Sequence, residues 1–139
     1  MYYIEHLDEW LKCKHQNGTS VRGVACDCTG LVTGIYAEKG INITVNLNYG
    51  AFWYMKKGCE ELLLPYLEKY CNKVDELQEG DCISYKFGRS KYAHLSIYLG
   101  DGKIIHCNAD FGVEIINKGE LADRETGFWR LKDGFIQKD

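Results

Sequence analysis

The stretch Ala25-Cys26-Asp27-Cys28-Thr29-Gly30-Leu31-Val32 decides the expected fold, because it opens a helix. Asp27 is a favourable N-cap residue, and the larger side chains that follow recur at helical spacing, at positions 31, 32, 35 and 36. Gly40 is suited to end this helix after Glu38 and Lys39. The sequence therefore predicts a helix that begins at Cys28.

The position of Cys28 at the start of the helix affects the ionisation of its thiol. In the first turn of a helix, unpaired backbone N–H groups and the helix dipole favour negative charge. We expect a thiol there to shift toward the thiolate, which attacks carbonyl groups. The alternative is that Cys28 is a small buried core residue, as free cysteines often are. The residues downstream decide between the two interpretations.

Composition limits the kinds of protein that this chain can be. With 139 residues and 45% hydrophobic content, residues 1–139 are expected to form one folded domain. The net charge of −3 provides no basic patch, so no nucleic-acid partner is expected. No apolar run approaches the roughly 20 residues of a membrane span.

The cysteines and the N-terminal residues indicate the cellular compartment in which the protein is made. The seven cysteines form an odd set without framework-like spacing, and Met1 to His6 lacks the basic and apolar regions of a signal peptide. We therefore expect free thiols in a protein made in the cytoplasm. Work outside the cell would then require a phage particle, lysis or another non-classical exit.

The first half of the chain is expected to be mainly helical. Residues 2–13 carry an apolar stripe at helical spacing, and residues 14–24 form a loop in which His15 either lines a cleft or is simply solvated. Residues 41–47 alternate like a strand but also fit an extended connector. Residues 51–72 predict two short helices or one kinked helix, because a glycine and a proline interrupt them.

From Gly80 onward the hydrophobic period changes to two, which is typical of strands. Helices followed by an antiparallel meander indicate the α+β class. The expected strands are 82–87, 94–99, 103–107, 112–116 and 128–131.

Two histidines lie on neighbouring expected strands. His94, Ser96 and Tyr98 point to one face of their strand, and the leucines and isoleucine between them point to the other. His106 follows on the next strand, after a Gly100-Asp101-Gly102 turn. An odd number of loop residues places both histidines on one face, whereas an even number places them on opposite faces.

These motifs resemble the NlpC-type, papain-like cysteine peptidases that cut bacterial cell-wall peptides. That family carries D-C-S/L-G-L-V at its nucleophile, which Asp27 to Val32 matches closely. Its strand pair reads roughly P-G-D-x-x-x-F and then H-x-x-I-Y-L-G-x-G-x-x-I-H, which Glu79 to Phe87 and His94 to His106 match in most positions.

The similarity extends to the short phage and prophage branch, which is found with tail modules and gene-transfer particles. This resemblance rests on the dipeptides His15-Gln16, Gly23-Val24, Gly112-Val113 and Trp129-Arg130. It implies phage tail proteins as further partners.

The resemblance implies a papain-like α+β fold. N-terminal helices would pack on a C-terminal antiparallel sheet of five to six strands, with the nucleophile at a helix N-terminus. Cys28 would be the nucleophile, His94 the base and later the acid, and His106 the group that orients His94. The backbone N–H of Cys28 would help to hold the oxyanion.

The implied substrate is the stem peptide of peptidoglycan, cut between D-γ-glutamate and the following diamino acid, and no cofactor or metal is expected. Asp27 and Thr29 occupy positions where the family recognises the free amine and carboxylate of the substrate. Many members place a tyrosine before the nucleophile; here either His15 or another side chain replaces it, or the oxyanion site is weaker than usual. Thr29 keeps the hydroxyl of the usual serine but adds a methyl group.

Two alternatives remain. A zinc-binding module would draw its ligands from Cys26, Cys28, His106 and Cys107, with His15 as a further donor. A phage tail structural component would keep the fold with a weak or vestigial site. Acyl transfer and a secreted antibacterial effector would share the chemistry of the peptidase.

Overall fold

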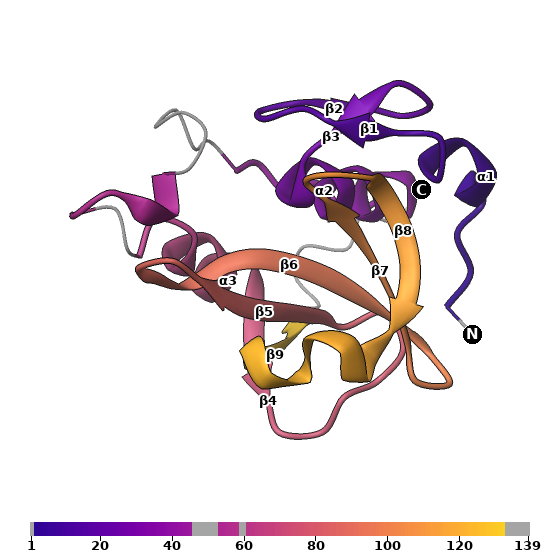
Figure 1. Cartoon of the computed structure of the whole chain (residues 1–139). Helices are drawn as coiled ribbons and strands as arrows, with labels where there is room; N and C mark the ends of the chain where they lie inside the picture. Colours follow the sequence, from indigo (N-terminus) through magenta and orange to yellow (C-terminus); the bar gives the residue numbers. More distant parts are fainter. Residues whose placement is uncertain (1, 46–52, 59–60, 133–139) are drawn as a thin grey trace.

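The computed structural model describes residues 2–45, 53–58 and 61–132. Figure 1 shows the course of the chain from the N-terminal elements to the C-terminal sheet. The elements are α1 (Leu7–Trp10), β1 (Lys14–His15), β2 (Ser20–Val21), β3 (Ala25–Cys26), α2 (Cys28–Glu38), η1 (Trp53–Met55), α3 (Leu64–Tyr70), β4 (Cys71–Val74), β5 (Cys82–Phe87), β6 (Ser90–Gly100), β7 (Lys103–Asn108), β8 (Gly112–Asn117), η2 (Lys118–Arg124) and β9 (Glu125–Leu131).

The C-terminal half forms a six-stranded sheet with the strand order β4-β9-β5-β6-β7-β8. All of its strand pairs are antiparallel, which confirms the predicted sheet of five to six strands. Strands β5 to β8 form the predicted meander. After β8 the chain crosses through η2, and β9 inserts between β4 and β5.

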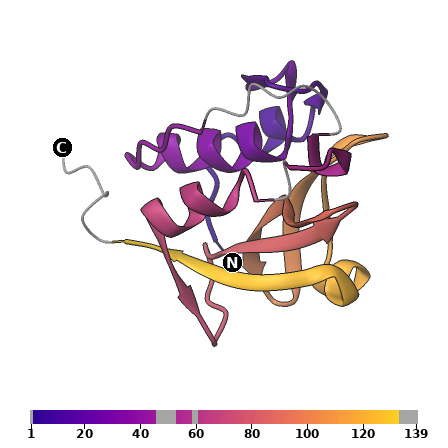
Figure 2. The ribbon, with the colours of Figure 1, turned by 90° about the vertical axis from the view of Figure 1, so that its left-hand side faces the viewer.

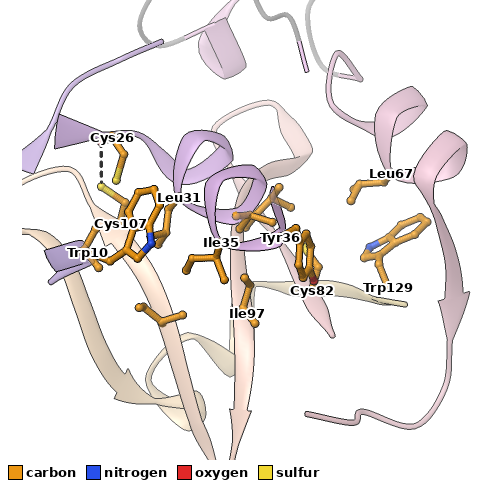
Figure 3. Packing of buried hydrophobic residues seen from close by; sticks show 14 of the residues in the cluster. Trp10, Cys26, Leu31, Ile35, Tyr36, Leu67, Cys82, Ile97, Cys107 and Trp129 are labelled. Carbon is orange, nitrogen blue, oxygen red and sulfur yellow. Dashed lines mark hydrogen bonds between the residues drawn. The ribbon is translucent and has the colours of Figure 1, made fainter. Parts of the chain in front are cut away.

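Helix α2 lies on one face of this sheet, in the same layer as α3 (Figure 2). The helix begins at Cys28 and ends at Glu38, as predicted, and the Asp27 carboxylate accepts the N–H of Gly30 at 2.7 Å. Its buried side chains share one core with the inward side chains of β6, and Figure 3 shows Ile35 and Tyr36 facing Ile97 and Cys82. This burial fixes the start of α2 against β6.

The opposite face of the sheet is also covered. Ile83, Tyr85 and Ile104 are fully buried there, and Leu121 of η2 packs against them. The sheet is therefore held from both sides, which makes it a rigid support for side chains at its edge.

The N-terminal segment differs from the prediction. A helix over residues 2–13 was expected, but only Leu7–Trp10 is helical. The N–H of Tyr2 instead donates to the carbonyl of Leu99 at 2.8 Å, and Ile4 is buried in the main core. Bonding to the sheet therefore replaces the first helical turns. The predicted loop over residues 14–24 contains the short strands β1 and β2, which flank β3 in a second sheet.

In the middle of the chain the structure agrees with one of the open interpretations at each segment and corrects the end of the predicted helical region. Residues 41–45 form an extended connector with a single bridge at Ile41, whereas positions 46–47 of the expected strand lie outside the described residues. The predicted two short helices correspond to η1 and α3, with Pro65 in the first turn of α3. Residues 51–52 and 59–60 of that prediction also lie outside the described residues. Cys71 begins strand β4 rather than continuing the helix.

Within the described ranges, no helix has the length and apolar character needed to cross a membrane. The cysteines that the structure describes are free thiols, as predicted: Cys13, Cys26, Cys28, Cys71, Cys82 and Cys107.

Candidate active site

The hairpin formed by β6 and β7 places the two histidines on one face. Ser96 pairs directly with His106, and His94 lies two residues before Ser96, so all three side chains point the same way. The turn itself, Asp101-Gly102, has two residues with positive φ (52° and 73°). Such an even turn alone would separate the histidines.

A β-bulge restores the shared face. The pairing changes register between Tyr98, opposite Ile104, and Gly100, opposite Lys103. One extra residue, Leu99, is thereby accommodated in β6. The bulge and the even turn together act as an odd loop, so the arrangement required for a catalytic pair is the one that forms.

His94 and His106 are joined by a hydrogen bond. The Nε2 of His94 lies 2.9 Å from the Nδ1 of His106, and the two rings are nearly perpendicular. The Phe87 and Tyr85 rings lie 5.5 Å and 5.7 Å from the His94 ring. These contacts hold the His94 imidazole in one orientation and leave its Nδ1 as the nitrogen available for another partner.

The chain of hydrogen bonds continues beyond His106. Its Nε2 lies 2.9 Å from Oε1 of Glu114, and the side-chain amide of Asn108 donates to the same oxygen at 3.1 Å. Sequence reasoning missed both Glu114 and Asn108. The pairing of His106 with Glu114 across β7 and β8 was the signal that could have identified Glu114, once the register of that hairpin was known.

The environment of Cys28 opposes the thiolate form that the sequence predicts. Burial, together with the nearby charge of Asp27, raises the pKa of the Cys28 thiol to about 12. The backbone N–H groups of Leu95 and Thr29 act in the opposite direction but are weaker than burial. Burial therefore outweighs the effect of the helix terminus on the pKa of this thiol.

The environment of His94 keeps it neutral at rest. Burial, followed by the proximity of His106 and His15, lowers the pKa of His94 to about 3. A neutral imidazole has one nitrogen with a free lone pair, which is the form that accepts a proton. The resting site therefore combines a neutral thiol with a neutral base.

One cavity of about 770 Å³ brings the six predicted site residues together: His15, Asp27, Cys28, Thr29, His94 and His106. Its wall also includes the aromatic residues Trp53, Tyr54 and Phe87, which the sequence did not assign to the site. Asp27 and Asp110 supply carboxylates, and no lysine or arginine is among the described residues that line it. The cavity therefore favours a ligand that carries a positive charge.

Asp27 and its neighbours shape the mouth of this cavity. One carboxylate oxygen of Asp27 accepts the N–H of Gly30 and the hydroxyl of Thr29, and the other accepts the N–H of Gly18 at 2.7 Å. His15 pairs in register with Cys26, directly before Asp27. The cap residue thus joins the helix to the preceding turn.

A buried thiol connects the two halves of the site. The Sγ of Cys107 donates to the carbonyl of Cys26 at 3.2 Å, which ties β7 to β3 (Figure 3). Both ring nitrogens of His106, one of the ligands in the zinc alternative, already have hydrogen-bond partners in His94 and Glu114. No group of three or more His, Cys, Asp or Glu suited to a metal occurs among the described residues.

The sequence profile of the NlpC/P60 family matches residues 14–130 of this chain. The chain belongs to the NlpC/P60 family. This confirms the predicted resemblance at the level of the family, together with the predicted enzyme class, a cysteine peptidase. No curated protein matches the chain closely enough to count as a relative.

Solved structures of NlpC/P60 proteins share this fold. An NlpC/P60 family protein from Bacillus cereus is 26% identical, with a TM-score of 0.56 over 79% of this chain and 33% of its own length. A lipoprotein-like NLP/P60 protein from Staphylococcus aureus is 18% identical, with a TM-score of 0.60 over 99% of this chain and 44% of its own. The chain thus spans less than half the length of these two proteins.

The NlpC/P60 domain of the peptidoglycan hydrolase SagA has a similar extent. It is 15% identical, with a TM-score of 0.64 over 92% of this chain and 95% of its own. This likeness confirms the predicted architecture of helices with an antiparallel sheet.

Proposed function

We propose that this chain is a cysteine endopeptidase that hydrolyses the stem peptides of peptidoglycan. The observation that carries the proposal is the cavity shared by Cys28, His94 and His106, with the two imidazoles in hydrogen-bond contact at 2.9 Å. Family membership supports the same class of reaction. SagA, a protein of the same fold, is a peptidoglycan hydrolase, which supports the choice of substrate.

The proposed reaction begins at the thiol of Cys28. His94 accepts the thiol proton as the sulfur attacks the peptide carbonyl, and the backbone N–H of Cys28 at the start of α2 helps to hold the oxyanion. His94 then protonates the leaving amine, and a water molecule releases the acyl-enzyme. General acid–base catalysis of this kind accelerates a reaction by roughly 10² to 10⁴. His106 orients His94 throughout.

The charge of the cavity supports a substrate with a free amine. Asp27 and Asp110 line the cavity, and Thr29 and His15 offer hydrogen-bonding groups beside them. A stem peptide cut between D-γ-glutamate and the diamino acid presents such an amine. We therefore assign Asp27, Thr29 and His15 to substrate recognition, with His15 in the place of the tyrosine that many family members carry.

We further infer delivery to the wall by a phage particle or by lysis, with phage tail proteins as partners. The supporting residues are the dipeptides that resemble the phage branch, His15-Gln16 and Gly23-Val24 before the nucleophile and Trp129-Arg130 near the end. Co-purification with assembled tail particles tests this part of the proposal. Recovery of the chain only as free protein during particle assembly argues against it.

Digestion of purified peptidoglycan, with mass spectrometry of the released peptides, tests the activity. We expect wild-type protein to release fragments with new D-γ-glutamyl ends, Cys28→Ala to release none, and His106→Ala to release them more slowly. Cys71→Ala is the control, because this buried thiol lies away from the cavity, at the start of β4. Activity that survives in Cys28→Ala refutes the nucleophile, and an inactive wild type favours the vestigial-site alternative.

A further inference from the structure

The carboxylate of Glu114 lies at the far end of the hydrogen-bonded row that begins at His94. Its Oε1 lies 2.9 Å from Nε2 of His106, and the side-chain amide of Asn108 donates a hydrogen bond to the same oxygen at 3.1 Å. An ionised carboxylate can only accept hydrogen bonds, so the proton of that contact belongs to Nε2 of His106. The position of one proton is thereby fixed.

This first assignment fixes the second histidine as well. A neutral imidazole that carries its proton on Nε2 has an acceptor at Nδ1. Since the Nδ1 of His106 faces the Nε2 of His94, the proton between the rings belongs to His94. The remaining nitrogen of His94, Nδ1, then carries the lone pair. That nitrogen is the one left to accept the proton of Cys28.

We propose that Glu114 is a positioning residue, which acts through His106 to hold His94 in the tautomer that can accept the Cys28 proton. This role rests on the proposed peptidase function and names a residue that completes it. As the thiol proton moves to Nδ1 of His94, the carboxylate also stabilises the resulting imidazolium through His106. The orienting unit is therefore His106 together with Glu114.

The surroundings favour Glu114 over other groups in this role. His106 is only 5% exposed, whereas the Glu114 side chain is 31% exposed, so the histidine side of this contact is shielded from bulk water and the carboxylate side is partly solvated. The other titratable groups that line the same cavity or contact the two imidazoles are His15, Asp27, Cys28, Tyr54, Tyr85, Cys107 and Asp110. Within the part of the chain that the structure describes, Glu114 is the carboxylate that hydrogen-bonds to these rings, through Nε2 of His106.

Glutamine at position 114 can present either its oxygen or its amide nitrogen to His106. When it presents the nitrogen, the protons on both histidine rings move to the opposite ring nitrogens. An amide that donates to Nε2 of His106 makes Nδ1 of His106 the donor, and Nδ1 of His94 then carries a proton. In a serine peptidase, the equivalent wrong tautomer lowers kcat about 10⁴-fold. Since glutamine can also present its oxygen, and acts through one more ring, we expect at least about a tenfold loss here.

Nitrogen-15 NMR of the ring nitrogens tests the proton order directly. The chain has four histidines, which makes assignment practical. We expect both His94 and His106 of the wild type to carry their proton on Nε2, and Glu114→Gln to populate the Nδ1-protonated form of His94. A wild-type His94 protonated on Nδ1, or the same tautomers in both proteins, overturns the inference.

Alkylation of Cys28 by iodoacetamide, mapped by peptide mass spectrometry, supplies a second test without substrate. We expect Glu114→Gln to slow Cys28 alkylation near neutral pH by about tenfold or more and to lower kcat on peptidoglycan peptides with little change in KM. Glu114→Asp, which keeps the charge, should be faster than Glu114→Gln. The matched control is Glu120→Gln, because Glu120 caps η2 away from the histidines, and it should react like the wild type.

Measuring the effect of Glu114→Gln in different variants separates the positioning role of Glu114 from the proposed peptidase function. In His106→Ala, Glu114→Gln should cause no further loss, because Glu114 acts through His106. A further loss there, or a wild-type rate in Glu114→Gln alone, refutes the positioning role while the peptidase stands. A wild-type Cys28 that reacts no faster than the Cys28 of His94→Ala refutes the peptidase proposal and this inference together.

Discussion

At the scale of single residues, Cys28 and His94 line one cavity in which the pKa values of both side chains are shifted toward the neutral forms. Burial holds the thiol and the imidazole in their neutral forms, with pKa values moved to about 12 and about 3. The sequence identified both residues but predicted a thiolate. Burial depends on how α2 packs against β6, and no local pattern around Cys28 contains that information.

The buried imidazole of His94 gives a prediction for stability in acid. Its pKa falls from 6.5 to about 3 on folding, so between these values the unfolded chain binds a proton that the folded chain does not. The free energy of unfolding should therefore decrease as the pH falls from 6.5 toward 3, by at most about 1.4 kcal/mol per pH unit. Melting temperatures measured across this window should fall less steeply for His94→Gln. Equal slopes in the two proteins contradict the shift.

His15 gives a second prediction at this scale. It lines the cavity and its proximity helps to lower the pKa of His94. His15→Ala should weaken substrate binding, raising KM several-fold, because the mutant loses a hydrogen-bonding group of the kind worth about 1 kcal/mol. Peptide cleavage measured over a range of substrate concentrations checks it, and His6→Ala serves as the control because His6 lies outside the cavity. An unchanged KM contradicts the assignment.

At the scale of elements, Gly30 explains how closely α2 and β2 approach each other. A Cβ on Gly30 would lie 2.1 Å from the carbonyl oxygen of Thr19, and the hydroxyl of Ser20 donates to the carbonyl of Gly30 at 2.8 Å. Only a residue without a side chain permits this contact. The glycine of the nucleophile motif is therefore a packing requirement of the cavity wall.

Gly30→Ala should consequently displace β2 from the helix. We expect a loss of about 1–3 kcal/mol in the free energy of unfolding, as for other overpacked sites, together with reduced cleavage. Urea unfolding measures the first effect. Gly119→Ala is the matched control, because a Cβ there meets nothing within 4 Å. A Gly30→Ala protein as stable as the wild type contradicts the close approach.

The elements also show where prediction from sequence reached its limit. Helix α2 and strands β5 to β8 were predicted within a few residues, because their hydrophobic periods and caps are local. Strand β4 was missed, since its pairing with β9 depends on residues far away in the chain. The bulge at Leu99 was also missed, and the sequence alone left open whether the two histidines share a face.

At the scale of the whole molecule, the described cysteines differ in how exposed their side chains are to solvent. Cys13, Cys26, Cys71, Cys82 and Cys107 are buried, and Cys28 is the one described cysteine that is partly exposed. Their positions in one core follow from the packing of the helix layer on the sheet. The number of thiols was evident from the sequence, but their depth required the fold.

Thiol labelling of the native protein should therefore report on the fold as a whole. We expect Cys28 to react with N-ethylmaleimide first among the described cysteines, and the buried ones to react only when the molecule unfolds. Peptide mapping after timed labelling, with and without urea, measures this order. Rapid labelling of Cys82 or Cys107 in the native protein is the result that contradicts the packing.

The bulge in β6 also indicates where foreign sequence can be grafted onto the molecule. Its extra residue lies before Gly100, whereas the tip of the hairpin, Asp101-Gly102, is exposed and takes no part in the cavity. A peptide tag or reporter inserted at the tip leaves the strand pairing from Tyr98 inward unchanged. Loss of the bulge, with Leu99 paired opposite Ile104 across the same two-residue turn, would instead shift the register by one residue and place the two imidazoles on opposite faces of the sheet.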